Sequence, residues 1–271
     1  MDFFENKIVI VTGAASGIGR ALSEELSRCK AILILIDRNA QLLGEVEKKI
    51  NQSSGRAESA VIDVADRPAV EKLVENTVSK HGRLDYIFNN AGIAIFGEVR
   101  DCTYADWEKV LDVNLYGPIN GALAAYPQML RQGSGHIVNT ASLAGLIPAE
   151  PLASYTAHGV VGMSLTLRME GADLGVKVSV VCPGLIQTPI FNSRTININR
   201  EKMLTNAPIG MAPEKCAKTI LRGVRRNKAI IIVTAPAWFF WWLYRFSPRL
   251  TLWLGTLFIR RFRKDLRVQN T

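Results

Sequence analysis

The chain has 271 residues, 48% of them hydrophobic, and a formal net charge of +9 at pH 7. This length suffices for a large core in one α/β domain. From Ala235 onward there are seven basic residues and one acidic residue, so +6 of the +9 lies in the C-terminal segment. Such a one-sided distribution argues against a general nucleic-acid-binding surface.

The four cysteines are widely spaced, with no C-x-x-C pair and no histidines at ligand spacing: Cys29, Cys102, Cys182 and Cys216. This pattern predicts reduced thiols and no metal site. The N-terminus has no basic region followed by a long apolar stretch, so we do not expect secretion and predict a cytoplasmic protein.

The first predicted element is a buried strand over Ile8–Val11, which runs into a glycine-rich turn and a helix start. The glycines let the backbone turn tightly and approach a ligand, and the free N–H groups of the helix start favour a pyrophosphate. A turn that only packs helix on sheet is the alternative. We predict cofactor contacts from Thr12, Gly13, Ser16, Gly17, Ile18 and Gly19.

Apolar runs typical of strands then alternate with helix-length amphipathic stretches. Further strands are predicted over Ile32–Ile36, Glu58–Ile62, Leu84–Phe88, His136–Asn139, Lys177–Val181 and Ala229–Val233. Helices are predicted over Ile18–Cys29, Ala40–Ile50, Arg67–Lys80, Tyr104–Arg131, Ala153–Gly171 and Pro213–Arg226. Continuous apolar strands are buried on both faces. We therefore predict a Rossmann-type, doubly wound parallel sheet in one α/β domain over residues 1–234.

Two features flank the predicted ligand edge of this sheet. Asp37 ends the second strand, eighteen residues after Gly19. A carboxylate there can accept both ribose hydroxyls and repels a 2′-phosphate, which favours NAD, although the adjacent Arg38 leaves NADP possible. A helix N-cap or a turn acid is the alternative role for Asp37. The segment from about 190 to 211 lacks periodicity and follows a strand end, so we predict a mobile substrate lid.

Several motifs, in order, make the chain resemble the short-chain dehydrogenase/reductase family over roughly residues 5–233. They are the glycine-rich turn, Asp63-Val64, Asn89-Asn90-Ala91-Gly92, Asn114, Ser142 with Tyr155, and Pro183-Gly184 with Thr188. The resemblance implies that Asp63 and Val64 flank the adenine, although a turn cap is the alternative role for Asp63. It also implies cofactor contacts from Asn90, Ala91, Gly92, Tyr155, Pro183, Gly184 and Thr188, and a homo-oligomer.

Hydride transfer at a carbonyl carbon needs a proton partner for the oxygen. A phenol can fill that role when a second hydroxyl orients the same oxygen. We predict Tyr155 as the proton partner and Ser142 as the orienting group; a packing role is the alternative for Tyr155. The resemblance adds Asn114 as the residue that holds a relay water.

The chain departs from the family pattern directly after Tyr155. The family continues Tyr-x-x-x-Lys, whereas here Thr156-Ala157-His158 follows, and the next lysine is Lys177. The simplest interpretation of this resemblance is that two residues, one of them the lysine, are absent between Ala157 and His158. Two residues turn a helix by about 200°, so we expect either that Tyr155 swings away from the crevice or that the helix after it presents a different face. The family lysine lowers the pKa of the phenol, and a free phenol titrates near ~10, so we expect impaired turnover, more for oxidation than for reduction. His158, three residues on, is a weaker substitute.

The segment 235–271 holds four of the five tryptophans and the basic cluster Arg260–Lys264. Pro248 predicts a break and a second helix start. The uncharged run Leu250–Ile259 is too short to span a bilayer. We predict amphipathic helices at a membrane interface, on the inner face of a membrane, with burial in an oligomer interface as the alternative.

These patterns predict an NAD(P)-dependent oxidoreductase that interconverts a secondary alcohol and a ketone on an apolar substrate, weakened by the missing lysine. The alternatives are a catalytically weak dinucleotide-binding sensor or scaffold at the membrane, and an interaction module whose Rossmann body is only structural. NADH binding separates the last from the others, and turnover separates the first two.

Overall fold

The centre of the molecule is a seven-stranded parallel sheet. The computed structural model describes residues 3–149, 153–206 and 209–267. The strand order is β3-β2-β1-β4-β6-β7-β9. The strands are β1 (Ile8–Thr12), β2 (Ile32–Asp37), β3 (Arg56–Val61), β4 (Tyr86–Asn89), β6 (Gly135–Thr140), β7 (Val176–Cys182) and β9 (Ile230–Ile232). Because the order reverses between β1 and β4, that point of the carboxyl edge is where ligands bind in such folds. The doubly wound prediction is confirmed.

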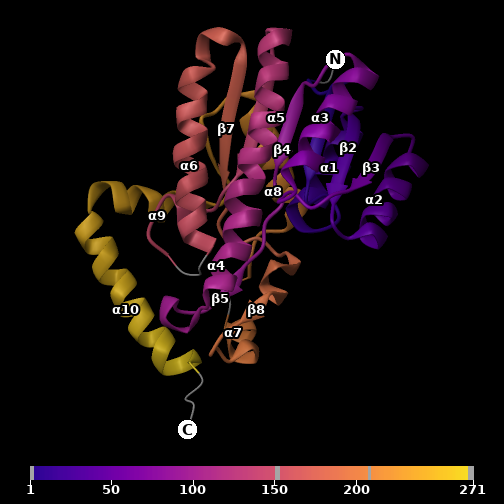
Figure 1. Cartoon of the computed structure of the whole chain (residues 1–271). Coiled ribbons are helices and arrows are strands. Elements are labelled where there is room, and N and C mark those ends of the chain that lie inside the picture. Colours follow the sequence, from indigo (N-terminus) through magenta and orange to yellow (C-terminus); the bar gives the residue numbers. More distant parts are fainter. Residues whose placement is uncertain (1–2, 150–152, 207–208, 268–271) are drawn as a thin grey trace.

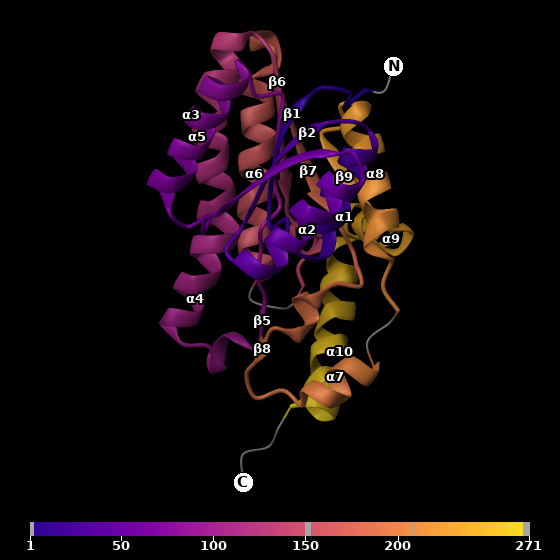
Figure 2. The same ribbon diagram turned by 90° about the vertical axis from the view of Figure 1, so that its right-hand side faces the viewer.

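Helices cover both faces of the sheet because the central strands are apolar on both sides. Val9 and Val11 of β1 pack with α1 (Gly17–Arg28), α2 (Ala40–Gln52) and α8 (Pro213–Arg225). Ile8 and Ile10 pack with α3 (Arg67–His81) and α5 (Gly117–Gln132). Figure 2 shows these two helical layers on opposite sides of the sheet. The helix α6 (Ala153–Glu170) covers β7 on the same side as α5.

The helix predicted over Tyr104–Arg131 is broken in the structure. It consists of α4 (Tyr104–Leu111), a π-helical turn over Asp112–Tyr116, and α5. Pro118 at the start of α5 has no backbone N–H to continue the regular ladder. A Cβ on Gly117 would lie 2.8 Å from the Val64 side chain, so the chain approaches Val64 closely here. Such π-turns are frequent at functional sites.

The predicted lid contains regular structure that the sequence did not indicate. A two-stranded parallel sheet joins β5 (Ile95–Phe96) to β8 (Arg194–Thr195), and a short helix α7 (Arg200–Asn206) follows. Whether the lid segment moves stays a prediction.

Short 3-10 turns occur at four places along the described part of the chain, of which only the last borders the lid: Val99–Asp101, Leu143–Gly145, Ala172–Leu174 and Pro189–Asn192.

The C-terminal segment forms two helices, α9 (Ala235–Phe246) and α10 (Pro248–Leu266), with the break at the predicted proline. Thr234 caps α9 by accepting the N–H of Ala237 at 3.3 Å. In Figure 1 α10 descends from α9 beyond the carboxyl edge of the sheet and ends beside α7. Among the described residues, no helix is both long and apolar enough to cross a bilayer.

Candidate active site at the carboxyl edge of the sheet

The strand ends at the switch point are held together by Thr12. Its hydroxyl oxygen accepts the backbone N–H groups of Asn90 and Ala91, both at 2.9 Å. The Asn90 side chain donates back to the Thr12 carbonyl at 3.2 Å. These three hydrogen bonds join β1 to the turn after β4. The first two motifs of the predicted cofactor site therefore form one rigid unit.

The glycine-rich turn is packed so closely that side chains would not fit. A Cβ on Gly19 would lie 2.0 Å from the Gly13 carbonyl oxygen, and one on Gly13 would lie 2.8 Å from the Ala91 Cα. Gly13 and Gly17 also have φ values of +66° and +52°, in the left-handed region. The N-cap Ser16 makes no side-chain cap bond, and Ile18 lies in the first turn of α1. The first N–H groups of α1 are thus left for an anion.

Asp37 stands at the end of β2, beside this turn. One carboxylate oxygen accepts the N–H of Ala15 at 3.1 Å and the other accepts the N–H of Asn39 at 2.9 Å. The N-cap of α2 is Asn39, whose side chain accepts from Leu42. The bond from the Asn39 N–H to Asp37 is a turn bond, so the alternative role as a turn acid is present beside the position at the glycine turn. The Arg38 side chain is exposed. Asp37 is half-buried and next to the glycine turn, where a carboxylate meets a ribose in dinucleotide-binding folds.

The predicted adenine-flanking pair follows β3. Val64 is buried, and its carbonyl oxygen accepts the Asn120 side chain of α5 at 2.9 Å. Asp63 is exposed, and its side chain accepts the N–H of Ala65 at 3.0 Å, which is a turn-cap bond. Both residues border the same edge of the sheet as Asp37, because β2 and β3 are neighbours in register.

Asn114 lies in the π-turn and grips the loop after β4. Its amide accepts the N–H of Ile93 at 2.8 Å and donates to the Ile93 carbonyl at 2.9 Å. A Cβ on Gly92 would lie 3.5 Å from the Asn114 oxygen. The Asn90-Ala91-Gly92 turn is therefore fixed at one end by Thr12 and at the other by Asn114.

Ser142 and the Pro183-Gly184 segment meet at the ends of β6 and β7. The Ser142 hydroxyl accepts the N–H of Ala144 at 3.1 Å, and the Leu143 N–H donates to the Pro183 carbonyl at 2.8 Å. Thr188 reaches the glycine turn from the other side, since a Cβ on Gly17 would lie 3.1 Å from its side chain. The structure thus brings Thr188 next to the glycine turn, and Ser142 next to Pro183.

Tyr155 is not brought into this group. Its side chain is 54% exposed, and its ring packs at 5.1 Å, centroid to centroid, on Trp107 of α4. No described residue forms a hydrogen bond with its hydroxyl, Ser142 included. The neighbours Ser154, Thr156 and Ala157 are buried instead. The face of α6 that carries Tyr155 is thus the outer one.

The position of Tyr155 follows from how the rest of α6 is anchored. Ser164 accepts the Asn139 side chain at 3.0 Å, and Arg168 donates to the Val178 carbonyl at 2.7 Å. With this end fixed, each residue turns the helix by about 100° and advances it by 1.5 Å. The exposed position of Tyr155 agrees with the expectation that the chain is two residues shorter than the family pattern before His158, which would rotate the tyrosine by about 200°.

His158 does not take the place of a lysine beside the tyrosine. It is exposed, and its Nδ1 lies 3.0 Å from the Ser154 carbonyl oxygen one turn earlier. Because a carbonyl only accepts, Nδ1 carries the proton in this contact. The imidazole is held against its own helix.

Sequence reasoning missed the buried polar chain under the site. The Asn89 side chain donates to Asn139 at 2.8 Å, which donates to Ser164, whose hydroxyl donates to the Val160 carbonyl at 2.6 Å. This chain ties β4, β6 and α6 together. It was visible only as polar residues inside apolar strands. Within the described part of the chain, no group of three or more potential metal ligands is found.

The residues present fit a dinucleotide. The glycine turn leaves no room for side chains, the N–H groups of α1 are open to a diphosphate, and a half-buried carboxylate stands where a ribose would lie. These are features of the backbone and of one acid, and none involves Tyr155.

Comparisons with known proteins agree with this geometry. The family model for short chain dehydrogenase matches residues 7–199. A protein described as oxidoreductase SadH from Mycobacterium tuberculosis is 35% identical over 246 residues, which cover 88% of this chain and 89% of that protein. The 3-oxoacyl-[acyl-carrier-protein] reductase FabG of Thermotoga maritima is 34% identical over 221 residues, covering 80% of this chain and 89% of the reductase.

Solved structures show the same fold. A short chain dehydrogenase/reductase from Burkholderia phymatum in complex with NAD superposes with a TM-score of 0.84 at 24% identity, covering 92% of this chain and 96% of the other. Levodione reductase superposes with a TM-score of 0.76 at 25% identity, covering 85% and 96%.

Proposed function

The chain belongs to the short-chain dehydrogenase family, and we propose that it is an NAD-dependent oxidoreductase that interconverts a secondary alcohol and a ketone on an apolar molecule. The observation that carries this proposal is the glycine turn, in which Gly13 and Gly19 have no space for a Cβ. A turn shaped only for helix packing has no need of open N–H groups and a neighbouring acid. NAD is favoured over NADP because the Asp37 carboxylate would repel a 2′-phosphate.

We propose the following residues as the cofactor site. The diphosphate and ribose side comprises Thr12, Gly13, Ser16, Gly17, Ile18, Gly19, Asp37 and Arg38. The adenine and nicotinamide sides comprise Asp63, Val64, Asn90, Ala91, Gly92, Pro183, Gly184 and Thr188. Tyr155, which the resemblance adds to the nicotinamide side, packs on Trp107 outside this group. NAD, when bound, supplies or accepts the hydride. Asn114 would hold a relay water, Ser142 would orient the substrate oxygen, and Tyr155 would exchange its proton.

The placement of Tyr155 limits this chemistry in the chain as it stands. The phenol lies on Trp107, on the outer face of α6, and the motif lysine is missing. Reduction uses the phenol as an acid and oxidation uses it as a base, so the absence of the lysine should weaken oxidation more than reduction. The proposal is tested by titrating the chain with NADH and then measuring ketone reduction and alcohol oxidation at pH 7. A chain that does not bind NADH contradicts it.

A second function is favoured by the same exposed tyrosine. A protein that binds the dinucleotide but turns over poorly could act as a sensor or scaffold at a membrane. Its distinguishing result is NADH affinity without measurable turnover of any secondary alcohol or ketone. The third possibility, a purely structural Rossmann body, requires that no NADH binds.

We also propose the wider organisation of the protein. Residues 1–234 are the dinucleotide-binding domain, with a substrate lid at about 190–211, and residues 235–271 are the membrane-interfacial tail. The exposed aromatic side chains of α9 and α10 support this reading of the tail. We propose a homo-oligomer in the cytoplasm, at the inner face of a membrane. Two of the tail arginines are already engaged within the protein, Arg263 with Glu98 and Arg267 with Glu98 and Asp101.

A further inference from the structure

The tail helices present an apolar surface that the body of the protein does not cover. On α10 only Thr251 is buried. Five large apolar side chains along one side of this helix are 40% to 64% exposed: Leu250, Trp253, Leu254, Leu257 and Phe258. Leu252, on the opposite side of the helix, is 51% exposed. On α9 four aromatic side chains are 43% to 80% exposed: Trp238, Phe239, Phe240 and Phe246. We refer to these nine residues as the tail face. A patch of this kind marks an interaction site.

The charges around the tail face indicate which partner it meets. Arg249, Arg260 and Lys264 are exposed and have no ion-pair partner among the described residues. Asp265 is the only acid of the tail, and it pairs with Arg261 at 3.4 Å. A second copy of this face would bring like charges together. An anionic bilayer offers apolar chains and negative charge at once, and aromatic and basic residues suit its surface.

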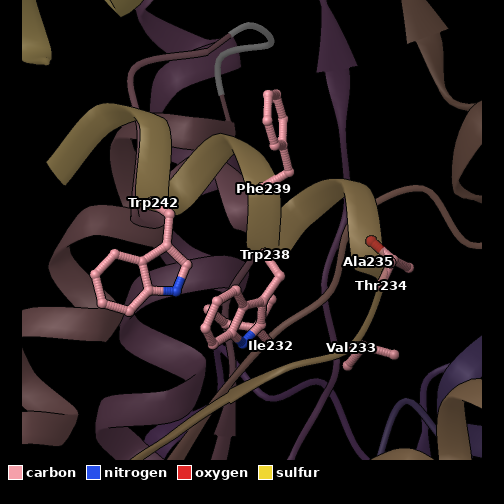
Figure 3. Close-up of a pocket in the computed structure, with 7 residues that line it drawn as sticks. All are labelled: Ile232, Val233, Thr234, Ala235, Trp238, Phe239 and Trp242. Carbon is pink, nitrogen blue, oxygen red and sulfur yellow. The ribbon is translucent and has the colours of Figure 1, made fainter. Parts of the chain in front are cut away.

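A hollow of about 550 Å³ at the start of the tail adds to this surface. It is lined by the end of β9 and one side of α9: Ile232, Val233, Thr234, Ala235, Trp238, Phe239 and Trp242. Figure 3 shows the rings of Trp238 and Trp242 on the same side of α9, with the Trp242 nitrogen directed toward Trp238. That nitrogen is buried and has no acceptor in the part of the chain described.

The start of α9 and the end of α10 both contact segments next to the candidate active site. At the start of α9, a Cβ on Gly184 would lie 2.3 Å from the Thr234 hydroxyl oxygen and 3.3 Å from the Ala237 Cβ. The tail therefore begins against the Pro183-Gly184 segment that we assign to the nicotinamide. No flexible linker separates the two.

The far end of α10 is held by charged contacts. Arg263 binds Glu98 through contacts of 2.9 to 3.1 Å, and Arg267 binds both Glu98 and Asp101. The Arg263 guanidinium, with Arg100, holds the pKa of Glu98 at about 2, so this carboxylate stays ionised at cellular pH. The Leu266 carbonyl also accepts the N–H of Asn199, in the lid segment, at 2.8 Å.

We infer that the tail face docks on an anionic lipid bilayer and sets the carboxyl edge of the sheet against the membrane surface, so that the substrate is an alcohol or ketone dissolved in the bilayer. The assignment of substrate rests on the proposed function, whereas the docking does not. The middle of the tail is exposed while its ends join the nicotinamide segment and the lid. A lipid-borne molecule then has the shortest path to the site.

The docking is tested with the full chain and vesicles of phosphatidylcholine, with and without 30% phosphatidylserine, by flotation. We expect the chain to float with the anionic vesicles. The double variant Trp253→Ser, Leu257→Ser should bind at least tenfold more weakly. The double variant Arg260→Gln, Lys264→Gln should bind roughly 30-fold more weakly, at ~1 kcal/mol per charge. Two double variants of exposed residues in the body serve as matched controls: Leu123→Ser with Met169→Ser, and Lys215→Gln with Lys218→Gln. Both should float like the original chain.

The substrate assignment is tested by comparing a short water-soluble ketone with a long-chain ketone carried in the same vesicles. The Trp253→Ser, Leu257→Ser variant should reduce the soluble ketone within twofold of the original rate and lose more than tenfold on the vesicle-borne ketone. Equal losses on both, or on neither, overturn the assignment.

Two other results overturn the docking. One is a chain that stays at the bottom of the gradient. If that chain also self-associates in a concentration-dependent way, and the tail-face substitutions abolish the association, the tail face binds a second copy instead. The other is flotation that the tail-face substitutions leave unchanged. A chain that floats but turns over neither ketone contradicts the proposed function and the substrate assignment, while the docking stands.

Discussion

Two regions of this protein depend on the sequence in different ways. One is the cofactor cradle, formed by Thr12, the glycine turn and Asn90-Ala91-Gly92. The other, called the corner below, is the place where Tyr155 of α6 packs on Trp107. In the cradle, Thr12, Asn90 and Gly19 are each fixed by backbone contacts from another strand or turn. In the corner, Tyr155 depends only on the rotational setting of α6. Its ring lies on Trp107, on the outside of the helix.

From this difference we infer that a change in α6 would affect the chemistry without affecting dinucleotide binding. A site assembled from several strand ends tolerates a change in one helix, because each group has its own anchor. A group placed by one helix moves when two residues are missing, since the helix turns by about 200°. We therefore expect this chain to bind its dinucleotide and to lose most of its proton transfer.

The largest expected effect comes from restoring the missing residues. Insertion of Thr-Lys after Ala157 should raise alcohol oxidation at pH 7 by roughly 100-fold or more, because a positioned proton acceptor contributes about 10²–10⁴-fold. The initial rate with NAD and a secondary alcohol checks this. An insertion of Thr-Ala at the same point restores the rotation of Tyr155 about the axis of α6 but not the lysine. It should recover only part of the rate. Equal rates for the original and the Thr-Lys chain would refute the account of the corner.

The next effect should come from the cradle itself. Gly19→Ala places a Cβ 2.0 Å from the Gly13 carbonyl, so the turn must open. We expect NADH affinity to fall by at least tenfold, measured by fluorescence titration. Gly44→Ala in α2 is the control, since nothing lies within 4 Å of its Cβ. That change should leave affinity unchanged and stabilise the fold by about 0.5–1 kcal/mol. Unchanged NADH affinity in Gly19→Ala would contradict the cradle.

A smaller shift should follow from Asp37→Asn. Loss of the charge removes the repulsion of a 2′-phosphate and weakens the acceptance of ribose hydroxyls. We expect the ratio of NADH to NADPH affinity to fall roughly tenfold, by titration with both coenzymes. Asp173→Asn, on an exposed turn remote from β2, should leave the ratio as it is. A ratio that stays constant in Asp37→Asn would remove this residue from the ribose site.

A separate effect, on stability and not on binding or rate, concerns the sheet that both regions share. Burial lowers the pKa of His136 in β6 to about 3 from 6.5, so the native imidazole is neutral. Its Nε2 lies 2.8 Å from the Ser179 oxygen, whose own proton goes to the Lys228 carbonyl. Stability from this group is complete above pH 6.5 and falls by about 1.4 kcal/mol per unit as the pH drops toward 3, because only the unfolded histidine takes up a proton.

Urea unfolding of the original chain and of His136→Gln between pH 7 and pH 4 measures that contribution. When the free energy of unfolding is plotted against pH, the variant should lack the part of the slope that His136 contributes. NADH binding and the tertiary circular-dichroism signal should disappear at the same pH, since cradle and corner stand on one sheet. An identical slope in both proteins would show that His136 is not the titrating group.

The sequence predicted the sheet well because its strands are continuous apolar runs. Each of the seven predicted strands lies within two residues of an observed one, and the helix break at Pro248 was visible as a proline. The break inside Tyr104–Arg131 was missed, since α4 and α5 share a continuous helical pattern. The two-residue strands β5 and β8 are too short for any periodicity.

The residues of the cradle could be named from spacing, but contacts between distant residues could not. The bond from Arg263 to Glu98 joins residues 165 apart, and neither has a pattern that points to the other. The packing of Tyr155 on Trp107 likewise depends on the setting of α6. From the sequence, the missing lysine predicted weak catalysis. The two-residue shift also predicted that the tyrosine could swing away from the crevice, and its outward position agrees with that expectation.

The most direct test of the account is a crystal structure of the unmodified chain soaked with NADH. We predict a diphosphate on the N–H groups at the start of α1, a nicotinamide beside Gly184, and the Tyr155 ring still against Trp107. An empty carboxyl edge, or a Tyr155 hydroxyl within hydrogen-bond distance of the nicotinamide ribose, would contradict the account.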